Sequence, residues 1–172
     1  PNGIHQGVRE GSRQVDVTPK LRVGLEEEVF IVNELGFLAK HSEAVVEGLL
    51  EVLRSDEELL TEARRRLIGL QWEPNPSQLE YVTKPLSPHD AVRAAALARR
   101  MLGEAASKRS LLVYLGSAHP VQSAPLPLNG THVNVSIAPK GARGASPRLV
   151  ARVFNHIRNH LPELIALTAN TP

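Results

Sequence analysis

The amino-acid sequence predicts an α+β fold in which a curved, mostly antiparallel sheet is backed by helices. Several segments alternate between apolar and polar residues, a period that is typical of strands with one buried face. Longer segments between them repeat their apolar residues at helical spacing. Strands with one polar and one apolar face favour antiparallel pairing with helices on a single side. The connections do not reveal the order in which the strands pair.

The elements follow one another along the chain with clear start signals. Ser42 is the predicted N-cap of the first helical pattern, which we expect to break near residues 54–56. Ser87 followed by Pro88 is a strong helix start, and the last helix, with the same start, should bend at Pro162. In chain order, we expect strands at 21–33, 78–84, 111–117 and 131–138, and helices at 42–67, 88–108 and 147–169.

Composition limits the class of protein. The 172 residues, 42% hydrophobic and 22% charged, are enough for one domain with a core. We expect residues 1–20 to be a leader, possibly flexible, and residues 21–172 to form the domain. No apolar run is long enough to cross a membrane, and the first residues lack the hydrophobic segment of a signal peptide, so we expect a cytoplasmic protein that does not bind membranes.

Charge and residue usage also exclude some partners. A net charge of +2 with 3% aromatic residues disfavours a nucleic-acid partner. The absence of cysteine excludes disulfides and zinc held by sulfur. Any metal must therefore be held by oxygen and imidazole ligands.

Three consecutive carboxylates interrupt the first strand. In "LRVGLEEEVFIVNE", Glu26 and Glu28 share a face, with Cα atoms about 6.5–7 Å apart, whereas Glu27 points to the opposite, apolar face. We expect Glu27 to be structural, and it could pair with an arginine across the sheet. Crowded like charges require a cation, a partner or water.

Two other strands offer ligand-type side chains. Glu73 precedes and Glu80 lies within the strand in "EPNPSQLEYVT", and His132, Asn134 and Ser136 share one face of "NGTHVNVSIA". Together with Glu26 and Glu28, these groups could hold Mg²⁺ or Mn²⁺, which prefer oxygen ligands and tolerate an imidazole. Taken alone, the glutamate run is more often a solvated face that discourages aggregation, and a lone histidine is more often structural.

A basic loop precedes the last helix. In "PKGARGASPR", Lys140, Arg143 and the backbone N–H groups could hold a phosphate group. The loop lacks the P-loop pattern, and a surface turn is an equally good interpretation.

The same residues carry a family resemblance. The segments "VGLEEEVFIV", "EPNPSQLEYVTKP", "LLVYLGSAHPV", "LNGTHVNVSIA" and "NHLPELIALTANTP", in this order, resemble the glutamate–cysteine ligase type 2 family, carboxylate–amine ligases with a glutamine-synthetase-like fold. The resemblance implies that ATP phosphorylates the γ-carboxylate of glutamate and that the amine of cysteine displaces the phosphate, a step of glutathione biosynthesis. It also implies a sheet that holds two or three Mg²⁺ ions.

Residue by residue, the resemblance implies roles for the matching positions. The metal ligands would be Glu26, Glu28, Glu73 and Glu80, and His132 would contact a metal or a nucleotide phosphate. His119, in the "GSAHP" loop, would line the substrate pocket. We assign Asn134, Ser136, Lys140 and Arg143 as further candidates for substrate or nucleotide binding.

The sequence departs from the family in its length. Such ligases continue beyond the "ANTP" motif, so we expect residues 21–172 to be the N-terminal portion of a glutamate–cysteine ligase-like catalytic domain that is inactive alone. Either the chain is a fragment of a longer product, or it works as a homo-oligomer or with a complementary C-terminal half, or it has lost catalysis and kept binding. Two alternatives remain open. One is a metal-dependent phosphate-ester hydrolase that uses the same carboxylates. The other is a non-catalytic, partner-dependent subunit, which would be favoured if the carboxylates were scattered over an exposed face.

Overall fold

A computed structural model describes residues 20–119, 128–138 and 146–163. Lys140, Arg143 and almost all of the leader at 1–20 lie outside these ranges, as do residues 164–172, which include the whole "ANTP" motif. The elements are β1 (Lys20–Asn33), α1 (Ser42–Ser55), α2 (Glu57–Arg66), β2 (Leu67–Trp72), β3 (Gln78–Thr83), α3 (Pro88–Ser107), β4 (Leu111–Tyr114), β5 (Thr131–Ala138) and α4 (Pro147–Asn159).

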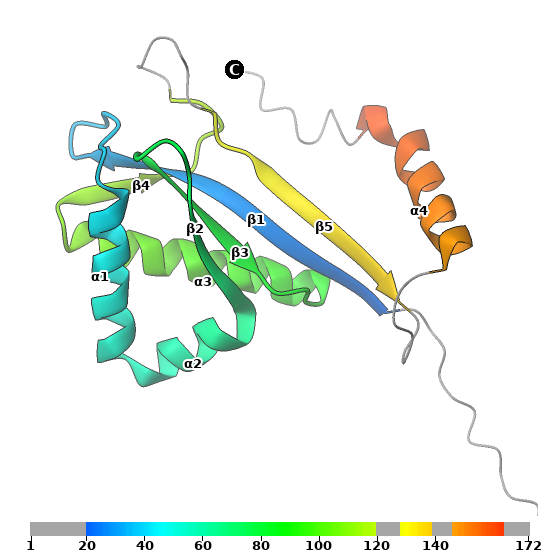
Figure 1. Ribbon diagram of the computed structural model, residues 1–172, viewed down its shortest axis with the longest axis horizontal. Coiled ribbons are helices and arrows are strands. Elements are labelled where there is room, and N and C mark those ends of the chain that lie inside the picture. Colours follow the sequence, from blue (N-terminus) through cyan, green and yellow to red (C-terminus); the bar gives the residue numbers. More distant parts are fainter. Residues whose placement is uncertain (1–19, 120–127, 139–145, 164–172) are drawn as a thin grey trace, which may run out of the picture.

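The five strands form one sheet whose pairs are all antiparallel (Figure 1). The long strand β1 lies at its centre and pairs with β3 along one edge. Along its other edge, the first part of β1 pairs with β5 and the last part with β4. Strand β2 extends the sheet beyond β3. The predicted fold class, an antiparallel sheet backed by helices, is confirmed.

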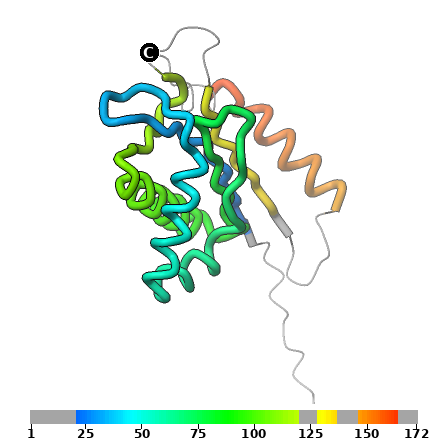
Figure 2. Tube along the Cα trace, turned by 60° about the vertical axis from the view of Figure 1, so that its left-hand side comes forward, coloured from blue at the N-terminus to red at the C-terminus, as the bar shows by residue number. Residues whose placement is uncertain are grey.

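Helices α1, α2 and α3 cover one face of the sheet and enclose the core (Figures 1 and 2). From the sheet, Val29, Ile31 and Leu79 point into this core, and all are fully buried. The alanine-rich face of α3 lets the helices approach closely. At the crossing with α1, a Cβ added to Gly48 would lie 2.7 Å from the carbonyl oxygen of Ala105.

The helix break expected near residues 54–56 has a simple cause. Asp56 adopts an extended backbone between α1 and α2, and its side chain accepts a hydrogen bond of 2.8 Å from the Leu59 N–H. Asp56 is therefore the N-cap of α2. Likewise, Ser87 caps α3 by accepting a hydrogen bond from the Asp90 N–H.

Strand β2 was missed in the sequence analysis, which placed Leu67 at the end of a helix and left residues 68–72 unassigned. The helix ends at Arg66, and Leu67–Trp72 pairs with β3. Two features explain the error. The side chains of β2 do not alternate between buried and exposed, and its register shifts between Leu67 and Gly69.

Two further boundaries differ from expectation. Strand β4 ends at Tyr114, so it is shorter than the predicted 111–117. Helix α4 ends at Asn159, and residues 161–163 are again helical after a break at His160, so the interruption lies two residues before Pro162, where we had expected a bend. Proline lacks the N–H that a continuing helix needs, so an early end is consistent with its position.

Helix α4 stands apart from the other three helices (Figures 1 and 2). Several of its large apolar side chains are exposed, namely Val150, Ile157 and Phe154, the last at 63%.

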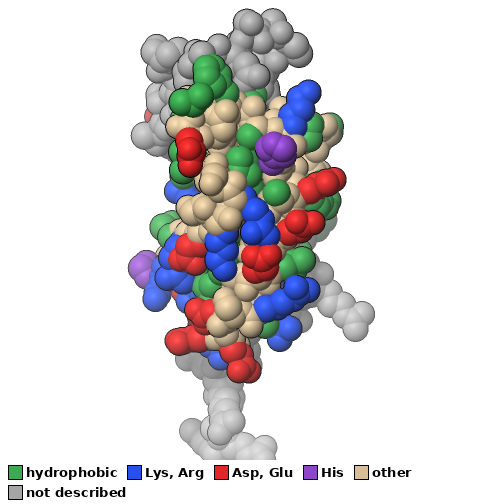
Figure 3. Space-filling model, turned by 90° about the vertical axis from the view of Figure 1, so that its left-hand side faces the viewer, with side chains coloured by type: hydrophobic (Ala, Val, Ile, Leu, Met, Phe, Trp, Pro, Cys, Tyr) green, Lys and Arg blue, Asp and Glu red, His purple; other side chains and the backbone are tan. Residues whose placement is uncertain are grey.

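Within the described part of the chain, no helix is both long and apolar enough to cross a membrane. On the face shown in Figure 3, acidic and basic side chains are intermingled.

Candidate metal centre

The candidate ligands on β1 point away from the helices that cover the core. Glu26 and Glu28 alternate with Glu27 along the strand, so they lie on the open face of the sheet. On one side of β1, Glu80 is the direct partner of Glu28. On the other side, His132 of β5 is the direct partner of Glu26. Ligand-type side chains therefore flank β1 from both neighbouring strands.

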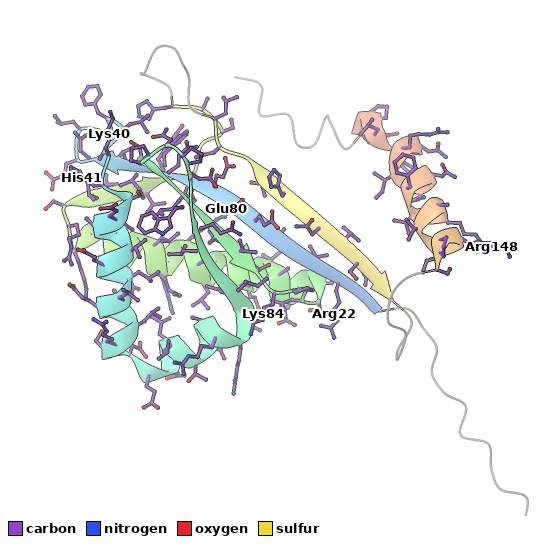
Figure 4. The ribbon with its side chains drawn as sticks, in the orientation of Figure 1. Arg22, Lys40, His41, Glu80, Lys84 and Arg148 are labelled. Carbon is purple, nitrogen blue, oxygen red and sulfur yellow. The ribbon has the colours of Figure 1, made fainter. Side chains whose placement is uncertain are left out.

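These side chains form two overlapping groups of three. Ligand atoms of Glu26, Glu80 and His132 lie within 4.8 Å of one another, and so do those of Glu28, Glu73 and Glu80. Glu80 belongs to both groups, and Figure 4 labels it on β3. One group offers two carboxylates and an imidazole, the other three carboxylates. Both donor sets fit Mg²⁺ or Mn²⁺.

The turn between β2 and β3 places Glu73 beside the sheet. It follows Trp72, whose partner on β3 is Leu79, so the turn begins directly at Glu73. Asn75 stabilises this turn, because its side-chain oxygen accepts a hydrogen bond of 3.0 Å from the Ser77 N–H. The spacing of six residues between Glu73 and Glu80 thus corresponds to a hairpin that folds one carboxylate back towards the other.

Hydrogen bonds from β5 and its preceding residue orient the carboxylates of β1. Glu26 accepts a hydrogen bond of 2.9 Å from the side-chain amide of Asn134, and its other oxygen lies 3.2 Å from Nδ1 of His132. Glu28 accepts a hydrogen bond of 2.7 Å from the Gly130 N–H. Asn134 therefore supports a candidate ligand directly.

The electrostatics of the centre favour a bound cation. Burial raises the pKa of Glu80, whose side chain is almost fully enclosed, and the charges of Glu73, Glu26 and Glu28 raise it further. Burial also raises the pKa of Glu73, and the charge of Glu28 adds to the effect. Ionised carboxylates are thus held close together at a cost in free energy that a divalent cation would relieve.

Glu27 belongs to a separate structural cluster on the helix side of the sheet. Its carboxylate accepts hydrogen bonds from Nε and Nη2 of Arg99, at 2.8 and 2.5 Å, and from the hydroxyl of Tyr81 at 2.6 Å. Burial raises the pKa of Glu27, but the hydrogen bonds from Arg99 and Tyr81 and the charge of Arg99 outweigh this, so the pKa lies below its usual range. The structural role expected for Glu27 agrees with these contacts.

The arginine that pairs with Glu27 comes from a helix. Arg99 lies on α3 and not across the sheet, where the sequence had suggested that an arginine could lie. The cross-strand partner of Glu27 is Tyr81. The cluster therefore ties two strands to a helix.

His119 lies at one end of the sheet and is almost fully enclosed, with 3% of its surface exposed. Its Nε2 is 2.7 Å from the carbonyl oxygen of Gly36, and its ring meets those of Phe30 and Tyr114 edge to face. These contacts link His119 to the turn after β1 and to the sheet. They do not test its role in a substrate pocket, which stays a prediction.

The remaining candidates have different surroundings. Ser136 is exposed on β5 and lies opposite Arg22 of β1, towards the end of the sheet where Figure 4 labels Arg22. Lys140 and Arg143 are outside the described residues, so their assignment also stays a prediction.

Three groups near the centre were not singled out from the sequence. They are the backbone N–H of Gly130, the side chain of Gln78 and the side chain of Asn129. Alternation alone could have suggested Gln78, because it lies two residues before Glu80 and shares its face. The other two could not be found this way, because their contacts join residues far apart in the sequence.

The fold is similar to that of GmaS, solved without ligand, with a TM-score of 0.53 and 15% sequence identity. The match covers 74% of this chain and 31% of GmaS. It concerns the fold alone, and places the sheet and its helices in the glutamine-synthetase-like class.

In sequence, the chain is 30% identical over 178 residues to a putative glutamate–cysteine ligase 2-1 of Rhodococcus jostii (strain RHA1). The match covers 88% of this chain and 42% of that relative, so the chain spans less than half the relative's length. No protein-family model matches the chain. The match to this relative confirms the resemblance that the motifs indicate, which is to the glutamate–cysteine ligase type 2 family, whereas the likeness to GmaS concerns the fold alone.

Proposed function

We propose that this chain supplies part of the metal and ATP site of an ATP-dependent carboxylate–amine ligase. The reaction would join the γ-carboxylate of glutamate to an amine such as that of cysteine, through an acyl phosphate. The observation that supports this most is the convergence of Glu26, Glu28, Glu73, Glu80 and His132 on one open face of the sheet. The relationship to a putative glutamate–cysteine ligase supports the choice of reaction.

The residues of the centre suit this chemistry. When bound, Mg²⁺ or Mn²⁺ would neutralise charge on the phosphate oxygens during phosphoryl transfer. Glu80, shared by both groups of ligands, would be one of the residues that hold the metal in either group. The Gly130 N–H and the Asn134 amide would keep the carboxylates of Glu28 and Glu26 in place.

The two alternatives fare differently. A non-catalytic subunit was expected to have carboxylates scattered over an exposed face, whereas Glu80 is 7% exposed and its carboxylate lies close to those of Glu26, Glu28 and Glu73. A phosphate-ester hydrolase would use the same metal centre. It differs from the ligase only in the molecule that accepts the phosphoryl group, which is water in the hydrolase and the glutamate carboxylate in the ligase. A cytoplasmic location and association with further copies or a complementary half remain part of the proposal.

Isothermal titration of the purified chain with Mn²⁺ and a non-hydrolysable ATP analogue tests the proposal. We expect nucleotide binding that depends on Mn²⁺, its loss in Glu28→Gln, and its retention in Glu34→Gln. Glu34 is a suitable control because it is exposed and follows β1, outside both groups of ligands. An absence of metal-dependent nucleotide binding in the wild type would contradict the proposal and leave the non-catalytic subunit.

A second measurement separates the ligase from the hydrolase. Because the chain is expected to be inactive alone, ADP and phosphate release is followed for the chain together with the partner that completes it. The reactions contain no amino acid, glutamate alone, or glutamate plus cysteine, and the peptide product is quantified. Phosphate release without either amino acid would favour the hydrolase. Product formation that requires both amino acids would support the ligase.

A further inference from the structure

The segment that leads into β5 is held by a compact set of hydrogen bonds. The backbone N–H of Asn129 donates to the carbonyl of Ser117 at 2.8 Å, and its side-chain amide donates to the carbonyl of Gly116 at 3.1 Å. Leu128 forms an isolated antiparallel bridge with Ala118. Residues 128 and 129 are thus attached to the segment that follows β4.

Gln78 attaches the same two residues to β3. Its side-chain nitrogen donates to the carbonyl of Leu128 and to Oδ1 of Asn129, both at 2.8 Å. Gln78 is 7% exposed and lies on the same face as Glu80, two residues further along β3. A primary amide has two N–H donors, and Gln78 uses one for Leu128 and the other for Asn129. Asn129 is therefore held both by β3 and by the segment that follows β4.

The residues that follow make direct contact with the candidate ligands of β1. Gly130, next to Asn129, donates its N–H to the carboxylate of Glu28, and its carbonyl accepts a hydrogen bond of 3.0 Å from the Glu28 N–H. His132 follows two residues later and reaches Glu26. A shift of β5 by one residue would move His132 to the opposite face, because side chains alternate along a strand.

We propose that Gln78 and Asn129 are positioning residues of the metal centre. They set the register of β5 against β1, so that the Gly130 N–H meets Glu28 and His132 meets Glu26. Neither residue is a candidate ligand, and both act through groups that are. This inference rests on the proposed function for its consequence, which is metal affinity, but the hydrogen-bond network exists independently of it.

The test compares Gln78→Met and Asn129→Ala with the wild type and with Gln71→Met. Gln71 lies directly opposite Glu80 on β2, is exposed, and makes no side-chain hydrogen bond to another described residue. Methionine is similar to glutamine in length and cannot donate a hydrogen bond. Gln71→Met therefore makes the same chemical change on the same face without touching the network.

Two measurements are made on each protein. Amide hydrogen exchange of Gly130, measured without metal, should be faster in Gln78→Met and Asn129→Ala and unchanged in Gln71→Met. Mn²⁺ affinity from calorimetry should fall by roughly 10- to 100-fold in the first two variants, the usual effect of removing support behind a metal ligand. In the wild type, Mn²⁺ should selectively broaden the NMR signals of the His132 imidazole. This broadening should be lost in Gln78→Met and Asn129→Ala together with the Mn²⁺ affinity.

Each outcome has a distinct meaning. If the wild type binds no Mn²⁺, the proposed function fails, and exchange at Gly130 alone decides whether the two residues position β5. If Gly130 exchange and the His132 signals are the same as in wild type in both variants, the positioning role is wrong. An equal loss of Mn²⁺ affinity in Gln71→Met would also overturn it. Should Gln78→Met fail to fold, Asn129→Ala carries the same comparison.

Discussion

Replacing Glu80 with glutamine should have opposite effects on the metal-free and metal-bound protein. Glu80 is almost fully enclosed, belongs to both groups of candidate ligands, and accepts no hydrogen bond from another described residue. Glu80→Gln preserves the shape of the side chain and removes its charge. The substitution therefore removes repulsion without breaking a hydrogen bond in the described part of the structure.

The separations in the centre give the size of the effect. Two unit charges at 4.8 Å, the upper limit for the ligand atoms of each group, repel by about 0.9 kcal/mol in water and about 3.5 kcal/mol at the effective dielectric constant of a protein surface. The partner Glu26 is about one third exposed, which weakens the repulsion towards the lower value. We expect Glu80→Gln to stabilise the metal-free protein by roughly 1–3 kcal/mol at pH 7.

The pH dependence follows from the raised pKa of Glu80. A carboxyl group whose pKa is higher in the folded than in the unfolded state costs stability as pH rises through the folded value. Below the unfolded value, the group is protonated in both states and the cost is absent. The advantage of Glu80→Gln should therefore be present at neutral pH and disappear in acid.

Metal should reverse the ranking. Mn²⁺ at about 1,000 times its dissociation constant would stabilise the wild type by about 4.1 kcal/mol, and Glu80→Gln should lose most of this gain because both groups of ligands contain Glu80. Urea unfolding followed by circular dichroism, with chelator and with Mn²⁺, measures both effects. The reasoning is refuted if Glu80→Gln destabilises the metal-free protein at pH 7, or if Mn²⁺ stabilises both proteins equally.

Two further substitutions test the packing that supports the centre. Arg99→Met should cost about 2 kcal/mol in urea unfolding, less than a fully buried pair because the Arg99 side chain is 45% exposed. The loss should shrink as pH falls through the lowered pKa of Glu27, and a loss within error of zero at pH 7 would contradict it. Gly48→Ala should cost about 1–3 kcal/mol, because its Cβ would meet the Ala105 carbonyl. Thermal unfolding measures this cost. Gly103→Ala is the control, because a Cβ added there meets nothing within 4 Å, and it should not destabilise the protein.

Much of the fold could be predicted because its signals are local. Alternation along residues 21–33 placed Glu26 and Glu28 on one face and Glu27 on the other, as the structure has them. Serine caps placed the starts of α1 and α3. In α1, however, Ser42 is the first helical residue and His41 occupies the cap position, so that boundary moved by one residue. Strand β2 lacked a local signal because its residues do not alternate at the edge of the sheet.

The composition and the alternation of residues were sufficient to predict a polar sheet face that carries Glu26, Glu28, Glu80 and His132, since these patterns depend on neighbours along the chain. Strand order, the pairing of Glu28 with Glu80 and the contact of Arg99 with Glu27 could not be predicted in the same way. Those pairs join residues 52 and 72 positions apart, and many registers satisfy the same alternation. Packing of the helices on one face selects a single register, and that selection brings the carboxylates together.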